Sequence, residues 1–403
     1  MTIPTQIVAA TETLTAEEIK ARAESIIEDL KQYADQAEAD RRLRKESVEL
    51  IKNNGLLRTV QPKSCGGHEL PFRSYIDVLA AVGEGCGATA WVLGVWHAHS
   101  WLMGHFPRQA QQDVYGDNPD TFVSAVIAPR GKAIRQGDGS YVLNGFWPFG
   151  SGCEHSQWLI LGAEVFDESG EMIDEADLLM PTGDVEIKDD WYVAGLQGTG
   201  SNSLVARDVR IPPHRYLSIP QYTEREAPAY KAEDTGWVTR SQAVPVLAIC
   251  LVGGALGVAR AALKEFKKIV PGKKVPYTGH IADDWIPVQV ALGSAAAEIH
   301  AAELVMYKMA DDIDHYARLN EAMPMEMRGR IRMDCCLSVK MLLDAVDKLF
   351  HYAGASALSL RNMLQRASRD LHATNMHALL MYDASAEIYG RILLGKGSNS
   401  PVI

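Results

Sequence analysis

The sequence predicts an α+β fold in which helices and strands occupy separate parts of the chain. Three observations favour this class: helical periodicity over roughly the first 110 residues, short β-branched runs separated by Gly, Asp and Pro from 122 to 216, and long helical patterns after 237. They indicate an N-terminal helical domain at 1–118, a small β domain (barrel or sandwich) at 119–232 and a C-terminal four-helix bundle at 233–403.

The N-terminal region predicts four helices. The first begins after a capping box at Thr15 to Glu18 and runs to about Ala37, with one apolar stripe at helical spacing. The second runs from Lys45 to Asn54 and ends at Gly55, a residue suited to a left-handed cap. Two apolar helices follow, at 74–85 and 88–104.

The centre of the chain is organised around residues 145–158. This stretch lies between two strand-like runs, at 140–144 and 159–165, and carries too many glycines and aromatics for a simple strand. It is therefore expected to be a loop whose backbone a flat ring can approach closely. Further strands are expected at 121–127 and 204–211, and long helices at 238–269, 284–317, 325–353 and 362–394.

Composition excludes several classes of function. The net charge of −11 argues against nucleic acid or an anionic membrane as a partner, because either needs a concentrated basic surface. Six cysteines without C-x-x-C spacing argue against a disulfide framework. With no basic leader and no apolar stretch near the roughly 20 residues that span a bilayer, a cytoplasmic location is expected.

Three stretches together resemble the acyl-CoA dehydrogenase superfamily: the segment around Ser151, the segment 191–201 (WYVAGLQGTGS) and the segment 365–370 (QRASRD). Within that superfamily, the chain is similar to the oxygenase components of two-component flavin-dependent monooxygenases. These act on p-hydroxyphenylacetate, on phenolic steroid catabolites, on dibenzothiophene and on indole. The resemblance in domain order covers essentially the whole chain.

The resemblance implies a homotetramer that uses reduced FMN, or FAD, delivered by a separate flavin reductase as a transient partner. Oxygen would add at flavin C4a, and the hydroperoxide would hydroxylate a small aromatic or heteroaromatic substrate of phenol or indole type. N- or S-oxygenation stays open. Two other functions are weighed against it: an acyl-CoA dehydrogenase, and a degenerate relative that serves as a scaffold.

The resemblance also assigns residues to the flavin. Ser151 falls where the family places a hydroxyl against the central ring, and there it could donate a hydrogen bond to flavin N5 or to a peroxide. Phe149 falls beside the ring, and Gly150 lets the backbone approach it. Thr199 and Ser201 match a loop that contacts the flavin or its phosphate. The alternative for both segments is an ordinary tight turn.

Two histidines are catalytic candidates. His377 stands at or next to the position where several dehydrogenases carry a carboxylate base, and its imidazole could accept a phenol proton. Helical spacing predicts Asp370, Thr374 and His377 on one face, with His372 on another. At His99 the related oxygenases tend to have a histidine that reaches the substrate. For each, the alternative is a structural or solvated histidine.

Tryptophans could wall the substrate site and keep water out, and Trp96 and Trp147 are the candidates, although plain packing is the alternative for each. A metal site is not expected, because His97, His99 and His105 do not converge on one helical face and no carboxylate joins them.

Overall fold

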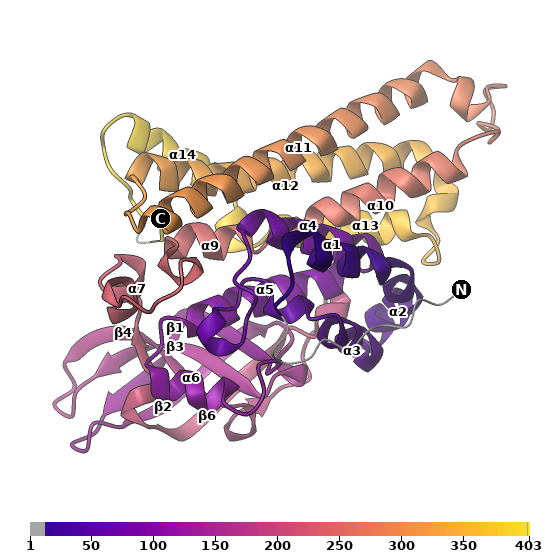
Figure 1. The fold of residues 1–403 in the computed structure, drawn as a ribbon. Helices are drawn as coiled ribbons and strands as arrows, with labels where there is room; N and C mark the ends of the chain where they lie inside the picture. The colour runs from indigo at the N-terminus through magenta and orange to yellow at the C-terminus, as the bar shows by residue number, and fades with distance from the viewer. Residues whose placement is uncertain (1–12, 401) are drawn as a thin grey trace.

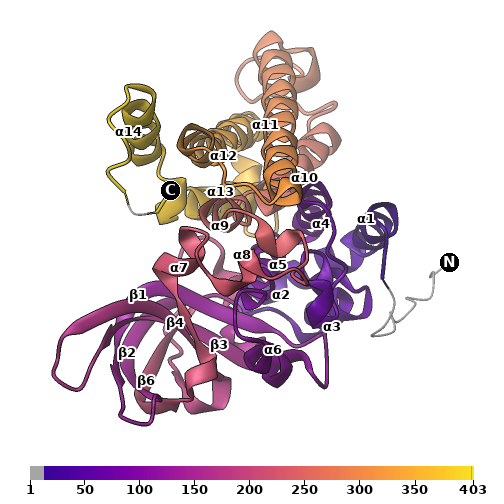
Figure 2. The ribbon, with the colours of Figure 1, turned by 60° about the vertical axis from the view of Figure 1, so that its left-hand side comes forward.

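The computed structural model describes residues 13–400 and 402–403, which form three layers. The sheet lies on one side, the N-terminal helices lie in the middle and the long C-terminal helices lie on the opposite side (Figures 1 and 2). Helix α5 (Gly87–Met103) contacts both strand β1 (Val123–Arg135) and helix α10 (Gly253–Ile269). It therefore joins the sheet to the bundle.

The N-terminal layer begins as predicted and then differs. Thr15 Oγ1 accepts from the Glu18 amide at 3.2 Å and the Glu18 carboxylate accepts from the Thr15 amide at 2.8 Å, which confirms the capping box. The single helix expected to Ala37 is two helices that meet at Ile26, and the second continues to Asp40. Gly55 has φ +70° and follows α3, as predicted. The helices of this layer are α1 (Ala16–Ser25), α2 (Ile27–Asp40), α3 (Lys45–Asn53), α4 (Phe72–Gly85), α5 and α6 (Arg108–Tyr115).

The sheet has seven strands in the order β5-β6-β2-β1-β3-β4-β7. Strand β1 pairs with β3 in parallel, and the other neighbours are antiparallel. The remaining strands are β2 (Tyr141–Gly150), β3 (Trp158–Phe166), β4 (Met172–Pro181), β5 (Glu186–Ile187), β6 (Asn202–Ile211) and β7 (Tyr216–Ser218).

The loop expected at 145–158 is shorter than predicted. Strand β2 continues to Gly150, whose partner in β6 is Asn202. The register of β2 against β6 shifts after Leu143 and again after Trp147, so bulges rather than a loop accommodate the glycines and aromatics. Only residues 151–157 connect β2 to β3.

Two of the four long helices predicted in the C-terminal layer are interrupted. The first is α9 (Ala243–Ile249) followed by α10, and the last is α13 (Met363–Asn375) followed by α14 (Tyr382–Leu393). Helices α11 (Ile286–Leu319) and α12 (Met325–Ala353) are continuous. Among the described residues, Ala243–Ile269 is long and apolar enough to cross a membrane, contrary to expectation, but 83% of its most apolar window is buried inside the fold.

Two hydrophobic cores hold the layers together. One runs without interruption from the N-terminal helices into the bundle, and the other lies within the sheet. Helices α4 and α10 meet at glycines: a Cβ on Gly83 would lie 2.5 Å from the Gly254 carbonyl oxygen, and one on Gly257 would lie 2.0 Å from that of Ala80. The helical layers thus share one core, and the domain boundaries at 118 and 232 stay predictions.

Candidate functional site

A row of three hydroxyl groups lies where the end of β2 meets the start of β6. The Oγ atoms of Ser151 and Ser201 are 2.7 Å apart, and Ser201 Oγ is 2.7 Å from Thr199 Oγ1. Thr199 donates to the Leu196 carbonyl at 2.8 Å. The Gly152 amide donates to the Thr199 carbonyl at 3.2 Å, which ties the two segments together. The structure therefore brings together Ser151, Thr199 and Ser201, which the sequence placed in one site.

Trp91 of α5 extends this row toward the bundle, although sequence reasoning missed it. Its indole Nε1 donates to Ser151 Oγ at 3.2 Å, and its ring lies edge-to-face with His377, with centroids 5.8 Å apart. No motif marks Trp91, because an aromatic residue on an apolar helix usually indicates packing. Through this one side chain, candidate residues of the sheet and of the bundle meet.

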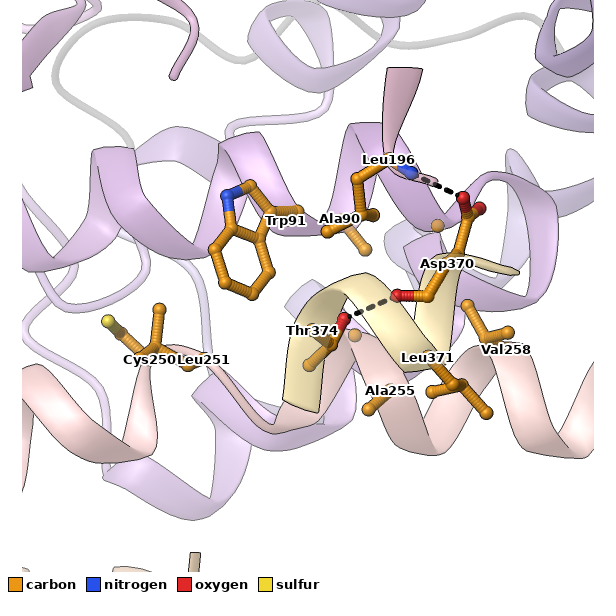
Figure 3. Close-up of a pocket in the computed structure, with 12 residues that line it drawn as sticks. Ala90, Trp91, Leu196, Cys250, Leu251, Ala255, Val258, Asp370, Leu371 and Thr374 are labelled. Atoms are coloured by element: carbon orange, nitrogen blue, oxygen red, sulfur yellow. Dashed lines mark hydrogen bonds between the residues drawn. The ribbon is translucent and has the colours of Figure 1, made fainter. Parts of the chain in front are cut away.

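Asp370 of α13 holds the segment that carries Thr199 and Ser201. Its carboxylate accepts from the Leu196 amide at 2.6 Å, and Leu196 has φ +53° (Figure 3). Burial raises the pKa of Asp370 to about 6, against the lowering effects of the Leu196 amide and of Arg366. Thr374 donates to the backbone carbonyl of Asp370 at 2.9 Å. Asp370 therefore acts on the site through the 196–201 segment.

A small pocket, with about 10 Å³ of space for a water-sized group, lies beside Trp91 (Figure 3). Apolar side chains supply most of its wall, and Asp370 and Thr374 are its polar members. The apolar side chains drawn in the figure are Ala90, Trp91, Leu196, Cys250, Leu251, Ala255, Val258 and Leu371. The wall is mostly apolar, but the space holds about one water molecule, so a ring would enter only if the lining side chains moved.

His377 lies in the site, but not as predicted. Helix α13 ends at Asn375, so His377 stands in the connection to α14 rather than on a helical face with Asp370 and Thr374. Its Nδ1 accepts from the Leu379 amide at 3.3 Å, which favours a hydrogen on Nε2. Burial lowers its pKa to about 4, so the ring is neutral at pH 7. His372 is exposed and pairs with Asp347 at 3.0 Å.

The two tryptophans predicted to wall the substrate are packing residues. Both are fully buried. Trp96 donates to Ser124 and Ser156 at 3.1 Å each and lies under Gly152, where it supports the turn after Ser151. Trp147 points into the sheet core and donates to the Gly162 carbonyl at 2.7 Å. Neither indole has free surface in this structure, which favours the packing alternative, and a contact with substrate stays a prediction.

The side chain of His99, on α5, is buried against strand β1. Its Nδ1 donates to the Val123 carbonyl at 3.0 Å, and the ring is 7% exposed. Burial lowers its pKa to about 4, so the ring is neutral at pH 7. This is the bonded core histidine that the sequence left as the alternative, and a role in orienting substrate stays a prediction.

The outer side of the site is apolar and open. Phe149 is 63% exposed, has φ +71° and meets Trp191 edge-to-face at 6.0 Å. Met376, next to His377, is 82% exposed. Ser151, two residues after Phe149, is 9% exposed. Within residues 13–400 and 402–403, no group of three His, Cys, Asp or Glu side chains is placed to hold a metal ion.

Comparison with known proteins identifies the family of the chain. Residues 249–382 match the family model of the acyl-CoA dehydrogenase C-terminal domain. The oxygenase subunit HsaA of a flavin-dependent monooxygenase from Mycobacterium tuberculosis is 32% identical over 93% of this chain and 95% of its own. The oxygenase component of p-hydroxyphenylacetate 3-hydroxylase from Acinetobacter baumannii is 29% identical over 93% of this chain and 88% of its own.

A solved structure extends the likeness to three dimensions. XiaF from Streptomyces sp., in complex with FADH2 and glycerol, superposes with a TM-score of 0.91 at 29% identity, over 96% of this chain and 98% of its own. The chain therefore belongs to the oxygenase components of flavin-dependent monooxygenases, a family built on the acyl-CoA dehydrogenase fold.

Proposed function

We propose that this protein uses reduced FMN or FAD and O2 to hydroxylate a small aromatic or heteroaromatic compound of phenol or indole type. The observation that carries the proposal is the meeting of Ser151, Trp91 and His377 beside a small pocket with mostly apolar walls. Relatives named for hydroxyphenylacetate, resorcinol and indole-3-acetate support the class of substrate. A relative named as FADH2-dependent and a complex with FADH2 support the reduced cofactor.

The open side of the site fits a flavin. Phe149, two residues before Ser151, and Met376, next to His377, offer exposed apolar surface, which a flat ring with polar edges can cover. The bound flavin would supply the electrons that activate O2. The chain's own part is to orient the rings, to exclude water and to hold hydrogen bonds at Ser151 and His377.

His377 is suited to hydrogen bonding more than to proton removal. A pKa of about 4 makes it a weak base toward a phenol, whose ordinary pKa is about 10. Its Nε2 hydrogen can instead be donated to a substrate oxygen, while the neutral ring adds no charge to the site. We therefore assign His377 to orienting and stabilising the reacting groups by hydrogen bonding.

The dehydrogenase alternative fits less well. Asp370, the carboxylate that lines the pocket, already accepts the Leu196 amide at 2.6 Å, so its position is fixed by the 196–201 segment. Residue 377 itself supplies an imidazole. If acyl-CoA added without oxygen bleaches the flavin of the loaded protein, the dehydrogenase reading replaces ours.

Assembly and location are further parts of the proposal. We infer that the chain forms a homotetramer; exposed apolar side chains in the α13–α14 region, including Leu393, Leu394, Met381 and Leu360, support association between copies. Native mass spectrometry tests the copy number. A separate reductase follows from the relatives' names as oxygenase components, and six buried free cysteines support a reducing, cytoplasmic location.

Oxygen labelling tests the activity directly. The protein is mixed with an unrelated flavin reductase, NADH, flavin and a panel of phenols and indoles under ¹⁸O2, and products are analysed by mass spectrometry. Incorporation of one ¹⁸O atom into the aromatic product is expected. If reduced flavin binds but the products carry no label with any member of the panel, the proposed function is wrong.

A variant tests the role of His377. His377→Ala should keep reduced-flavin binding, while hydroxylation falls roughly 10²-fold or more and hydrogen peroxide rises. His372→Ala is the matched control, because that histidine is exposed and pairs with Asp347. Coupled hydroxylation at the wild-type rate in His377→Ala would remove this histidine from the mechanism.

A further inference from the structure

The hydroxyl row has a fixed direction because of the groups at its two ends. The Trp91 indole N–H can only donate, and the Leu196 carbonyl can only accept. Four bonds join these ends through Ser151, Ser201 and Thr199, and four hydrogens are available for them. All four bonds form together only if Ser151 donates to Ser201, Ser201 donates to Thr199 and Thr199 donates to Leu196.

This direction determines what Ser151 can offer to a ligand. Its hydrogen is used by Ser201, and one of its two lone pairs is used by Trp91. The remaining lone pair can accept a hydrogen bond. Ser151 therefore receives a ligand donor, in contrast to the donor role that the sequence suggested for it.

We propose that the row selects the redox state of the flavin through this polarity. The inference rests on the proposed function. It adds that Thr199 and Ser201, which are 1% and 4% exposed, cause the preference for reduced over oxidised flavin. At its central ring edge, a reduced flavin carries a hydrogen on N5 and an oxidised flavin carries a bare, accepting nitrogen. In this orientation Ser151 can accept a hydrogen bond from N5–H of the reduced flavin. It presents a lone pair to the lone pair on N5 of the oxidised flavin, which is unfavourable.

The row could reverse to meet an oxidised flavin, but it would lose a bond. Ser151 would turn its hydrogen to N5, Ser201 would donate to Ser151, and Thr199 would donate to Ser201. The Thr199 bond to the Leu196 carbonyl would then be broken. The oxidised complex has one hydrogen bond fewer than the reduced complex, which corresponds to about a tenfold difference in affinity. Thr199 and Ser201 are thus positioning residues that act through Ser151.

Removing the end of the row tests the inference. Thr199→Val keeps the shape of the side chain but loses the hydroxyl, so Ser201 and Ser151 are free to reverse. Thr199→Ser keeps the hydroxyl and is the matched control. Dissociation constants for oxidised FMN and FAD are measured by fluorescence titration, and those for the reduced forms by anaerobic titration.

The ratio of the oxidised to the reduced dissociation constant should fall about tenfold in Thr199→Val and stay unchanged in Thr199→Ser. The midpoint potential of the bound flavin should fall by about 30 mV in the valine variant, since a two-electron couple shifts by that amount for each tenfold change. If Thr199→Val does not fold, Ser201→Ala interrupts the same row and should give the same fall.

The outcomes separate this inference from the proposed function. If the wild-type protein binds no reduced flavin, the proposed function fails and the selectivity fails with it. If it binds reduced flavin and incorporates ¹⁸O, but the folded variant keeps the wild-type ratio, only the inference is wrong. A fall in Thr199→Ser as large as that in Thr199→Val would also overturn it, because the hydroxyl would then not be the cause.

Discussion

Truncation of Asp370 should loosen the segment that carries the hydroxyl row. The Asp370 carboxylate accepts the Leu196 amide at 2.6 Å in a buried setting. A hydrogen bond to a charged group contributes about 1.5–3 kcal/mol, and Asp370→Ala leaves the amide without this acceptor. Taking about 2 kcal/mol, local opening of the segment becomes roughly 30-fold more frequent.

Hydrogen exchange followed by mass spectrometry measures this opening. Peptides covering 189–203 should exchange faster in Asp370→Ala, while peptides from the sheet core keep the wild-type rate. Asp370→Asn is the matched control, since its side-chain amide oxygen can still accept from the Leu196 amide. Its exchange rate for these peptides should lie between those of the wild type and Asp370→Ala. Unchanged exchange at Leu196 in the alanine variant would refute the reasoning.

Three further predictions concern stability. Burial lowers the pKa of His97 to about 4, so below pH 6.5 the unfolded chain binds a proton that the folded chain does not, and stability falls as the pH drops toward 4. Between pH 7 and pH 5, the free energy of unfolding measured by urea titration should therefore fall by roughly 2 kcal/mol less in His97→Gln than in the wild type. An equal fall in both proteins would contradict this prediction. Trp147→Phe should cost roughly 2 kcal/mol through lost volume and the lost bond to Gly162, with the product profile unchanged; an altered profile would restore Trp147 to the substrate wall. Gly152→Ala combines φ +70° with a Cβ 2.6 Å from Val92, and should lower the unfolding free energy by about 1–3 kcal/mol; a stability equal to wild type would show that the turn can relax.

Features fixed by neighbours in the sequence could be predicted. The capping box at Thr15 and the left-handed Gly55 depend on bonds and dihedral angles within a few residues, and both were confirmed. The hydroxyls of Ser151, Thr199 and Ser201 were also assigned to one site, because their segments resemble a known family. The class of fold followed from hydrophobic periodicity, which each element displays on its own.

Features that depend on distant partners could not be predicted. Periodicity continues through residues 376–381, but the His377 ring caps a short turn there and the helix is interrupted. The glycines of β2 suggested a loop because the bulges that absorb them form only against β6. Trp91 carried no local signal, since its role depends on Ser151 and His377, which approach it only in the folded protein.

The bonds of the site span large separations along the chain. Trp91 and Ser151 are 60 residues apart, Ser151 and Ser201 are 50 apart, and Leu196 and Asp370 are 174 apart. The site therefore exists only while all three layers are folded and packed together. Binding of a ligand to the site is then coupled to the folding of the whole chain. A ligand present at 100 times its dissociation constant would raise the free energy of unfolding by about 2.7 kcal/mol. Thermal-shift measurements can therefore rank flavins and substrates by affinity before any turnover is measured.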